Sequence, residues 1–223
     1  MRYPSRAYLP GPRHAYSSAI VSKADRGLCR RYLEHQAVRL PSHNARQLHV
    51  LLSGYAKVSA VSAMGDEDIL GFAMPGDILG LETLAPDTIP SEIIFLTEAT
   101  VAELTLEEAI RREDTVGGLG NGVCDLISRE LLRTQWRNRF VRNASVKTRV
   151  AQFLLELGKR FDEIDLPSHK FRLFMPREDI AVFLGMTKCT LSRTLQILCK
   201  CRLIDIDGSR WIEILEPVGL SQV

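Results

Sequence analysis

The sequence predicts an α+β protein in which a β-rich first half precedes a helical second half. Short apolar runs separated by Gly, Pro and Asp turns occupy residues 48–106, an apolar stripe at helical spacing occupies 123–143, and two short helices meet at a glycine within 174–204. These observations predict four segments, namely a flexible arm (1–24), a β-barrel domain (25–116), a hinge with a long helix (117–143) and a C-terminal helical domain (144–223).

The totals are those of an ordinary globular protein. The chain has 223 residues, enough for two domains with separate cores, and no apolar run approaches the length of a membrane span. Met1–Ser22 contains Arg, Pro and Ser but no apolar block of the kind that a signal peptide has, so we expect a mobile arm. The five cysteines are odd in number and show no zinc spacing, which favours a reduced, cytoplasmic protein.

The first half has the pattern of a small β-barrel. Between Leu48 and Leu106, short apolar stretches are interrupted by Ser53-Gly54, Gly65-Asp66 and Pro75-Gly76-Asp77. Several short strands at such spacing predict a barrel or sandwich of Greek-key or jelly-roll type. A barrel of this size either holds a small ligand or is packed solid, and the sequence leaves both possibilities open.

A glycine-rich break and a long helix follow the barrel. Gly117–Gly122 contains four glycines, too many for a helix interior, and therefore predicts a hinge. The helix beyond it has a stripe that alternates by three and four residues and predicts a homodimer seam. That seam comprises Ile127, Leu131, Thr134, Asn138 and Val141. The alternative is that the stripe packs against the protein's own barrel.

Residues 174–204 predict a helix-turn-helix. Pro176 suits a helix start, Gly185 allows the positive φ of a sharp helix end, and Thr187 can cap the second helix. The first helix would pack through Ile180, Phe183 and Leu184. At about 100° per residue, the outer face of the second helix gathers Lys188, Cys189, Ser192, Arg193 and Gln196. A small, polar and basic outer face is typical of a recognition helix, whereas the plainer interpretation is a helical hairpin with a solvated face.

A β-hairpin and a charge bias extend the pattern. Asp207-Gly208 separates two apolar stretches, Leu203–Ile206 and Trp211–Leu215, and predicts a tight hairpin that would form a wing. The net charge is +2, but residues 1–132 total −4 and residues 133–223 total +6. The positive excess therefore lies in the half with the helix-turn-helix, as expected for a domain that binds a polyanion.

In this order the segments resemble the Crp/Fnr family of bacterial transcription regulators, in particular its Fnr-like branch. The resemblance covers about Leu48 to Leu215 and is strongest in the helix-turn-helix. The matching residues are Leu52-Ser53-Gly54 with Lys57, Gly65-Asp66-Glu67 with Gly71-Phe72, Pro75-Gly76-Asp77 with Gly80, Arg177, Asp179-Ile180-Ala181, Leu184-Gly185, Thr187, Thr190, Ser192-Arg193 and Leu195.

The resemblance implies a cyclic-nucleotide-binding-type jelly roll, a dimerisation helix and a winged helix-turn-helix. It also implies a homodimer that binds a palindromic operator in double-stranded DNA and contacts RNA polymerase. Ser192 and Arg193 would read bases, and Lys188 would contact a base or a phosphate. The full set expected at the DNA is Arg177, Thr187, Lys188, Cys189, Thr190, Ser192, Arg193 and Gln196.

The sequence departs from the family at residues that bind effectors and bases. Most members have Glu where this chain has Cys189, so the usual half-site is not implied. No arginine lies between Gly76 and Thr97, where cyclic-nucleotide-binding members hold the phosphate. Iron–sulfur members need a cysteine cluster, but only Cys29 precedes the barrel and Ala102 stands near the expected barrel cysteine. We therefore expect no cofactor and leave the effector unassigned.

Other functions are less well supported by the residues. Cys189, at the positive end of a helix beside Lys188, could make a thiol-based redox switch, and a constitutive ligand-free regulator is the other alternative. Cys29 with His35, His43 and His49 matches no standard metal site, so no metal is expected. The sequence has no phosphate-binding Gly-rich loop, Gly-x-Ser-x-Gly or His-Glu-x-x-His motif, and we expect no enzyme.

Overall fold

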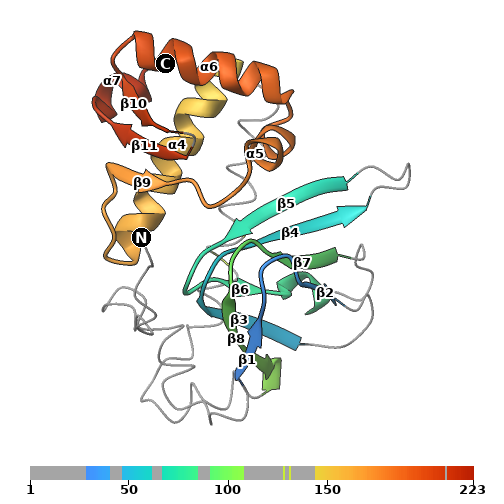
Figure 1. The fold of residues 1–223 in the computed structure, drawn as a ribbon. Helices are drawn as coiled ribbons and strands as arrows, with labels where there is room; N and C mark the ends of the chain where they lie inside the picture. The colour runs from blue at the N-terminus through green and yellow to red at the C-terminus, as the bar shows by residue number, and fades with distance from the viewer. Residues whose placement is uncertain are drawn as a thin grey trace. The chain divides into compact units, whose positions relative to one another are not determined.

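The chain divides into two compact units, residues 1–127 and 128–223 (Figure 1). The computed structural model describes residues 29–40, 47–61, 67–84, 91–107, 128, 131, 144–208 and 210–223. No helix within these ranges is long and apolar enough to cross a membrane.

The described part of the first unit is a jelly roll of two antiparallel four-stranded sheets, with the orders β1-β8-β3-β6 and β2-β7-β4-β5 (Figure 1). The strands thus form two separate sheets, and the barrel that the sequence predicts is not closed. The strands are β1 (Cys29–Tyr32), β2 (Ala37–Leu40), β3 (Gln47–Ser53), β4 (Ala56–Val61), β5 (Glu67–Ala73), β6 (Ile78–Leu79), β7 (Ser91–Phe95) and β8 (Ala99–Thr105).

Three strands were not predicted. The sequence shows no recognisable strand pattern before Leu48, yet β1 and β2 lie there and each pairs with a central strand. β1 reads Cys-Arg-Arg-Tyr, and of its four residues only Tyr32 is buried, so the strand lacks an apolar alternation. The two-residue β6 is too short for any periodicity. β1, β2 and β6 become strands because they pair with β8, β7 and β3, respectively. Their own residues do not predict them.

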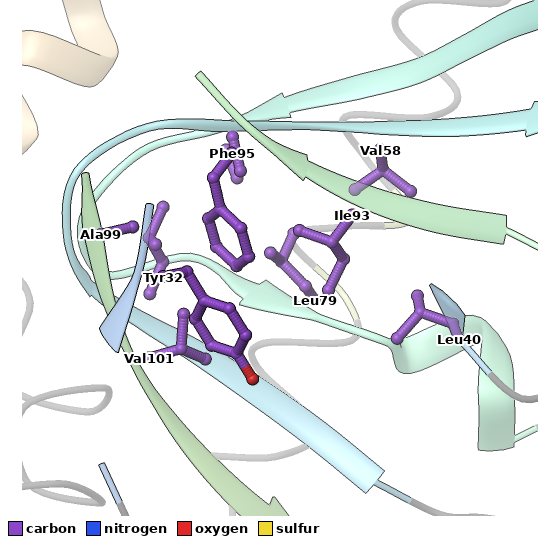
Figure 2. Packing of buried hydrophobic residues seen from close by; sticks show 11 residues of the cluster. Tyr32, Leu40, Val58, Leu79, Ile93, Phe95, Ala99 and Val101 are labelled. Carbon is purple, nitrogen blue, oxygen red and sulfur yellow. The ribbon is translucent and has the colours of Figure 1, made fainter. Parts of the chain in front are cut away.

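The interior between the sheets is filled by side chains. The rings of Tyr32 and Phe95 stack with centroids 4.5 Å apart, and Leu79, Ile93 and Val101 surround them (Figure 2). The Tyr32 hydroxyl donates a hydrogen bond to the carboxylate of Glu103, which also pairs with Arg30 at 3.3 Å. Burial, helped by the Glu103 carboxylate, raises the pKa of Tyr32 to about 12.

The β3–β4 turn depends on Gly54. Its φ is +86°, and a Cβ at this position would lie 2.4 Å from the carbonyl oxygen of Glu98 and 2.8 Å from the Cα of Ala99. Only glycine can therefore bring the two chain segments this close. Here the predicted turn is confirmed, together with its physical cause.

Several predicted segments lie outside the described residues. This is true of residues 1–28, the hinge Gly117–Gly122 and four of the predicted seam residues, namely Ile127, Thr134, Asn138 and Val141. Ser128 and Leu131 are described; both are helical and exposed, and Leu131 is 56% exposed. The helix predicted over Leu106–Asp114 is described only at its first two residues.

The second unit contains a winged helix-turn-helix (Figure 1). The 18-residue α4 begins after Ser145, whose hydroxyl accepts a hydrogen bond from the Thr148 amide at 3.1 Å, and it contacts α6, α7 and β9. The strands pair in the order β10-β11-β9, which confirms the predicted hairpin and adds a third strand. The elements are α4 (Val146–Glu163), β9 (Lys170–Arg172), α5 (Arg177–Phe183), α6 (Lys188–Lys200), β10 (Ile204–Asp207), β11 (Trp211–Ile214) and α7 (Pro217–Ser221).

Candidate nucleic-acid interface

The turn between α5 and α6 has the geometry that the sequence predicts. Gly185 has φ +63° and lies two residues after Phe183, the last residue of α5. Its amide donates to the Val182 carbonyl at 3.0 Å, and the Met186 amide donates to the Ala181 carbonyl at 2.9 Å. These two bonds form a Schellman motif, which ends α5 sharply and turns the chain into α6.

An arginine from α4 also holds this turn. The Nη1 atom of Arg149 donates hydrogen bonds to the carbonyl oxygens of Leu184 and Gly185, the second at 3.1 Å. The guanidinium thus binds the carbonyl groups at the negative end of α5, where a cation is favoured. The contact joins residues 35 positions apart, and the sequence offered no signal for it.

The start of α6 is capped as predicted. The Thr187 hydroxyl accepts a hydrogen bond from the Thr190 amide at 3.2 Å, and the two hydroxyls lie 2.9 Å apart. One turn further on, the Thr194 hydroxyl donates to the Thr190 carbonyl at 2.8 Å. These bonds fix the first turns of α6, from which the candidate DNA contacts project.

The two faces of α6 differ as the sequence predicts. The inner face buries Leu191, Thr194, Leu195 and Leu198. The candidate DNA contacts lie away from that core to different degrees. Thr187, Lys188, Cys189, Arg193 and Gln196 are exposed, whereas Thr190, Ser192 and Arg177 (the first residue of α5) are half-buried. The helix therefore brings most of the predicted residues together on one accessible surface.

Lys188 is joined to α5 by an ion pair. Its ammonium group donates a hydrogen bond to the Glu178 carboxylate, and the two side chains are 57% and 56% exposed. This hydrogen bond lowers the pKa of Glu178, so the carboxylate is charged at neutral pH. The sequence predicts that Lys188 contacts the DNA, but it gives no sign of the pairing with Glu178.

The wing sheet has a mixed and slightly acidic outer face. Arg172, Trp211 and Asp207 lie side by side in one cross-strand row, and Lys170, Glu213 and Asp205 in the next. Lys170 and Glu213 are bonded at 2.7 Å, which lowers the pKa of Glu213 and raises that of Lys170. These rows contain two cationic and three anionic side chains. This face therefore lacks the excess of positive charge that binding to DNA phosphates requires.

The cysteines and histidines form no described metal cluster. Within the described ranges, no group of three or more His, Cys, Asp or Glu side chains is placed to hold a metal ion. Cys189 and Cys201 are exposed, while burial raises the pKa of the half-buried Cys199. Of the histidines considered with Cys29, His35 is exposed, His49 is buried and His43 lies outside the described residues.

A jelly roll followed by a winged helix-turn-helix with a polar recognition surface defines a class of DNA-binding regulators. Comparison with known proteins agrees with this class. A family model described as a cyclic nucleotide-binding domain matches residues 29–111, and one described as a Crp-like helix-turn-helix domain matches residues 148–223. Each match falls within one of the two units.

The relatives that the chain resembles are named as regulators, and a solved structure shares its fold. The fumarate and nitrate reduction regulatory protein of Vibrio cholerae is 29% identical over 178 residues, which cover 80% of this chain and 71% of that protein. The transcriptional activator protein anr of Pseudomonas aeruginosa is 28% identical over 168 residues, covering 75% and 68%. The structure of FixK2 from Bradyrhizobium japonicum has the same fold, with a TM-score of 0.75 at 21% identity, covering 87% of this chain and 95% of that one.

The chain belongs to the Crp/Fnr family, on its Fnr-like branch, and is a DNA-binding transcription regulator. The predicted fold class and family are thereby confirmed. Members of this family are transcription regulators and not enzymes. The individual DNA contacts and the dimer seam stay predictions.

Proposed function

We propose that the protein binds a palindromic operator as a homodimer, with α6 of each subunit in a major groove. The main support is the exposed face of α6, where Lys188, Cys189, Arg193 and Gln196 are accessible together. A duplex with two-fold symmetric half-sites calls for a protein with two-fold symmetry. Leu131, helical and 56% exposed, is an apolar side chain available for a partner subunit.

The proposed contacts divide into base readers and phosphate contacts. Arg193 reads guanine through its forked guanidinium, a contact worth about 1–3 kcal/mol of discrimination, and Ser192 reads a neighbouring base edge. Lys188 reaches a base or a phosphate. The other contributors are Arg177, Thr187, Cys189, Thr190 and Gln196, which position the helix or line the groove. Cys189 is a poor acceptor for cytosine N4, so the half-site differs from that of members with Glu at this position.

The cellular setting of the proposal follows from the family. The dimer acts in the cytoplasm and contacts RNA polymerase at its target promoters. Among the described residues, Tyr32 stacked on Phe95 occupies the space between the two sheets, which supports a scaffold that works without a small molecule bound there. Equal operator affinity with and without added cyclic AMP would agree with this; a clear increase would replace the scaffold with a nucleotide sensor.

Selection from a random double-stranded DNA pool tests the proposed function. We expect a palindrome whose half-sites are about one helical turn apart. Arg193→Ala should weaken binding to it about 10- to 100-fold and relax the preference at one base pair per half-site. Lys159→Ala, which removes one positive charge from the exposed surface of α4, is the matched control and should change affinity little. Enrichment of no motif would contradict the proposal.

A redox-responsive regulator is the second candidate function. Cys189 is exposed as the second residue of α6, so oxidation there would place bulk and charge at the proposed DNA surface. Peroxide should then weaken operator binding by the wild type but not by Cys189→Ser. Equal behaviour of the two proteins would exclude this function and leave the DNA contacts unaffected.

A further inference from the structure

The ion pair between Glu178 and Lys188 lies at the edge of the proposed DNA-binding surface. Lys188 is the first residue of α6, and Glu178 is the second residue of α5. The Glu178 carboxylate accepts a hydrogen bond from the Lys188 ammonium, and each side chain is more than half exposed. The pair is therefore a surface contact that DNA can reach, and no buried packing depends on it.

The Glu178 carboxylate gives Lys188 an anionic partner of the kind that a DNA phosphate would be. Both groups are anionic oxygens, and an ammonium group binds either of them as a point charge. The start of α6 favours negative charge as well, because the helix dipole is positive there. DNA and Glu178 thus offer the same kind of partner to the same lysine.

The DNA-binding surface around α5 and α6 has only a few charged side chains, so the charge of the Glu178 carboxylate has a large effect on its total. Between residues 177 and 200 there are four cationic side chains, Arg177, Lys188, Arg193 and Lys200, against the two carboxylates of Glu178 and Asp179. Asp179 is half-buried, whereas Glu178 is exposed beside Lys188. Since non-specific binding to DNA is almost entirely electrostatic, one exposed anion here has a large proportional effect.

Given the proposed function, on which this inference depends, we propose that Glu178 competes with DNA for Lys188 and thereby sets the affinity of the protein for DNA. In the free protein Lys188 is held by Glu178. When α6 enters the groove, Lys188 exchanges this carboxylate for a phosphate or a base edge, and the ion pair with Glu178 is lost. The exchange weakens binding to any duplex. A larger share of the binding free energy then comes from the base contacts of Arg193 and Ser192.

Glu178→Gln tests this by removing the charge while keeping the shape of the side chain. Affinity is measured for a selected operator and for a random duplex of equal length, between 50 and 200 mM salt. We expect the variant to bind the random duplex about three- to tenfold more tightly, with a salt slope steeper by about one. Glu216→Gln is the matched control, since it removes one exposed negative charge before α7. It should change affinity less than twofold.

A double-mutant cycle with Lys188→Met separates competition from general repulsion. If Glu178 acts through Lys188, Glu178→Gln should change affinity less than twofold once Lys188 is absent. An equal gain in both backgrounds would overturn the competition, and so would unchanged or weaker binding by Glu178→Gln alone. If neither Lys188→Met nor Arg193→Ala weakens operator binding, the proposed function fails and this inference with it. Unchanged circular dichroism and melting temperature establish that each variant is folded.

Discussion

Two tight turns, one in each unit, depend on a glycine with positive φ but are held by different forces. In the jelly roll, steric exclusion requires glycine at position 54, because the backbone of Glu98 and Ala99 occupies the space that a Cβ would need. In the helix-turn-helix, Gly185 is held by bonds, two within the Schellman motif and two from Arg149. The Gly54 turn therefore tolerates no added Cβ. The Gly185 turn should instead lose stability stepwise as its hydrogen bonds are removed.

The largest expected effect is that of Gly54→Ala. A Cβ here is strained by the positive φ and meets backbone atoms that cannot move aside, so we expect a loss of about 3 kcal/mol in the free energy of unfolding. Gly208→Ala is the matched control. It has φ +63° with nothing within 4 Å of the added Cβ, so only the backbone strain of about 1 kcal/mol is lost. Denaturant titrations compare the two, and equal losses would contradict the role of exclusion.

Removal of the bonds from Arg149 should have the next largest effect. Arg149→Met keeps most of the aliphatic length but leaves the Leu184 and Gly185 carbonyls without a charged donor, at a cost of about 2–3 kcal/mol. Because the turn positions α6, operator affinity should fall as well, by about tenfold. Arg149→Lys should lie between Arg149→Met and the wild type in stability, and Lys147→Met serves as a control on the same turn of α4. An operator affinity that is unchanged in folded Arg149→Met would show that the turn does not depend on this contact.

These two turns also mark how much could be predicted from the sequence. Gly54 and Gly185 are visible as turn residues because only glycine suits their backbone, and the faces of α6 follow from helical periodicity. Local residues were therefore enough for α5, α6 and the β10–β11 hairpin. The exposed surface of α6 was predicted from the same periodicity.

What could not be predicted depends on contacts between distant residues. β1 becomes a strand by pairing with β8, although two of its four residues are arginines. Arg149 reaches the α5–α6 turn and Glu178 reaches Lys188 only because the helices pack together, and no spacing in the sequence indicates these distances. The stacking of Tyr32 on Phe95 likewise joins β1 to β7. The ring stack packs the space between the two sheets, and the Glu178 contact offsets the charge of Lys188 at the start of α6.

In the interior of the jelly roll, Tyr32 stabilises the fold through a side-chain hydrogen bond, and no steric need for a glycine is involved. Tyr32→Phe keeps the ring stack but removes the hydrogen bond to Glu103, and should cost about 1–2 kcal/mol at neutral pH. Because folding raises the pKa of Tyr32 from 10.0 to about 12, its stabilising effect is complete below pH 10 and is lost between pH 10 and about 12. The difference in unfolding free energy between the two proteins should shrink over this range. A difference that stays constant up to pH 12 would contradict the role of the hydroxyl proton.

The smallest effect is expected at a third turn, which has neither a glycine nor steric exclusion. Arg202 follows α6 with φ +56°, and its amide and that of Leu203 form the two bonds of a Schellman motif with Cys199 and Leu198. A side chain in this conformation is strained by about 1 kcal/mol, so Arg202→Gly should raise the free energy of unfolding by up to that amount. Arg202→Ala is the control, because it removes the same charge but keeps the Cβ and should bring no gain. If both variants gained equally, the gain would come from the lost charge, and relief of backbone strain would be excluded.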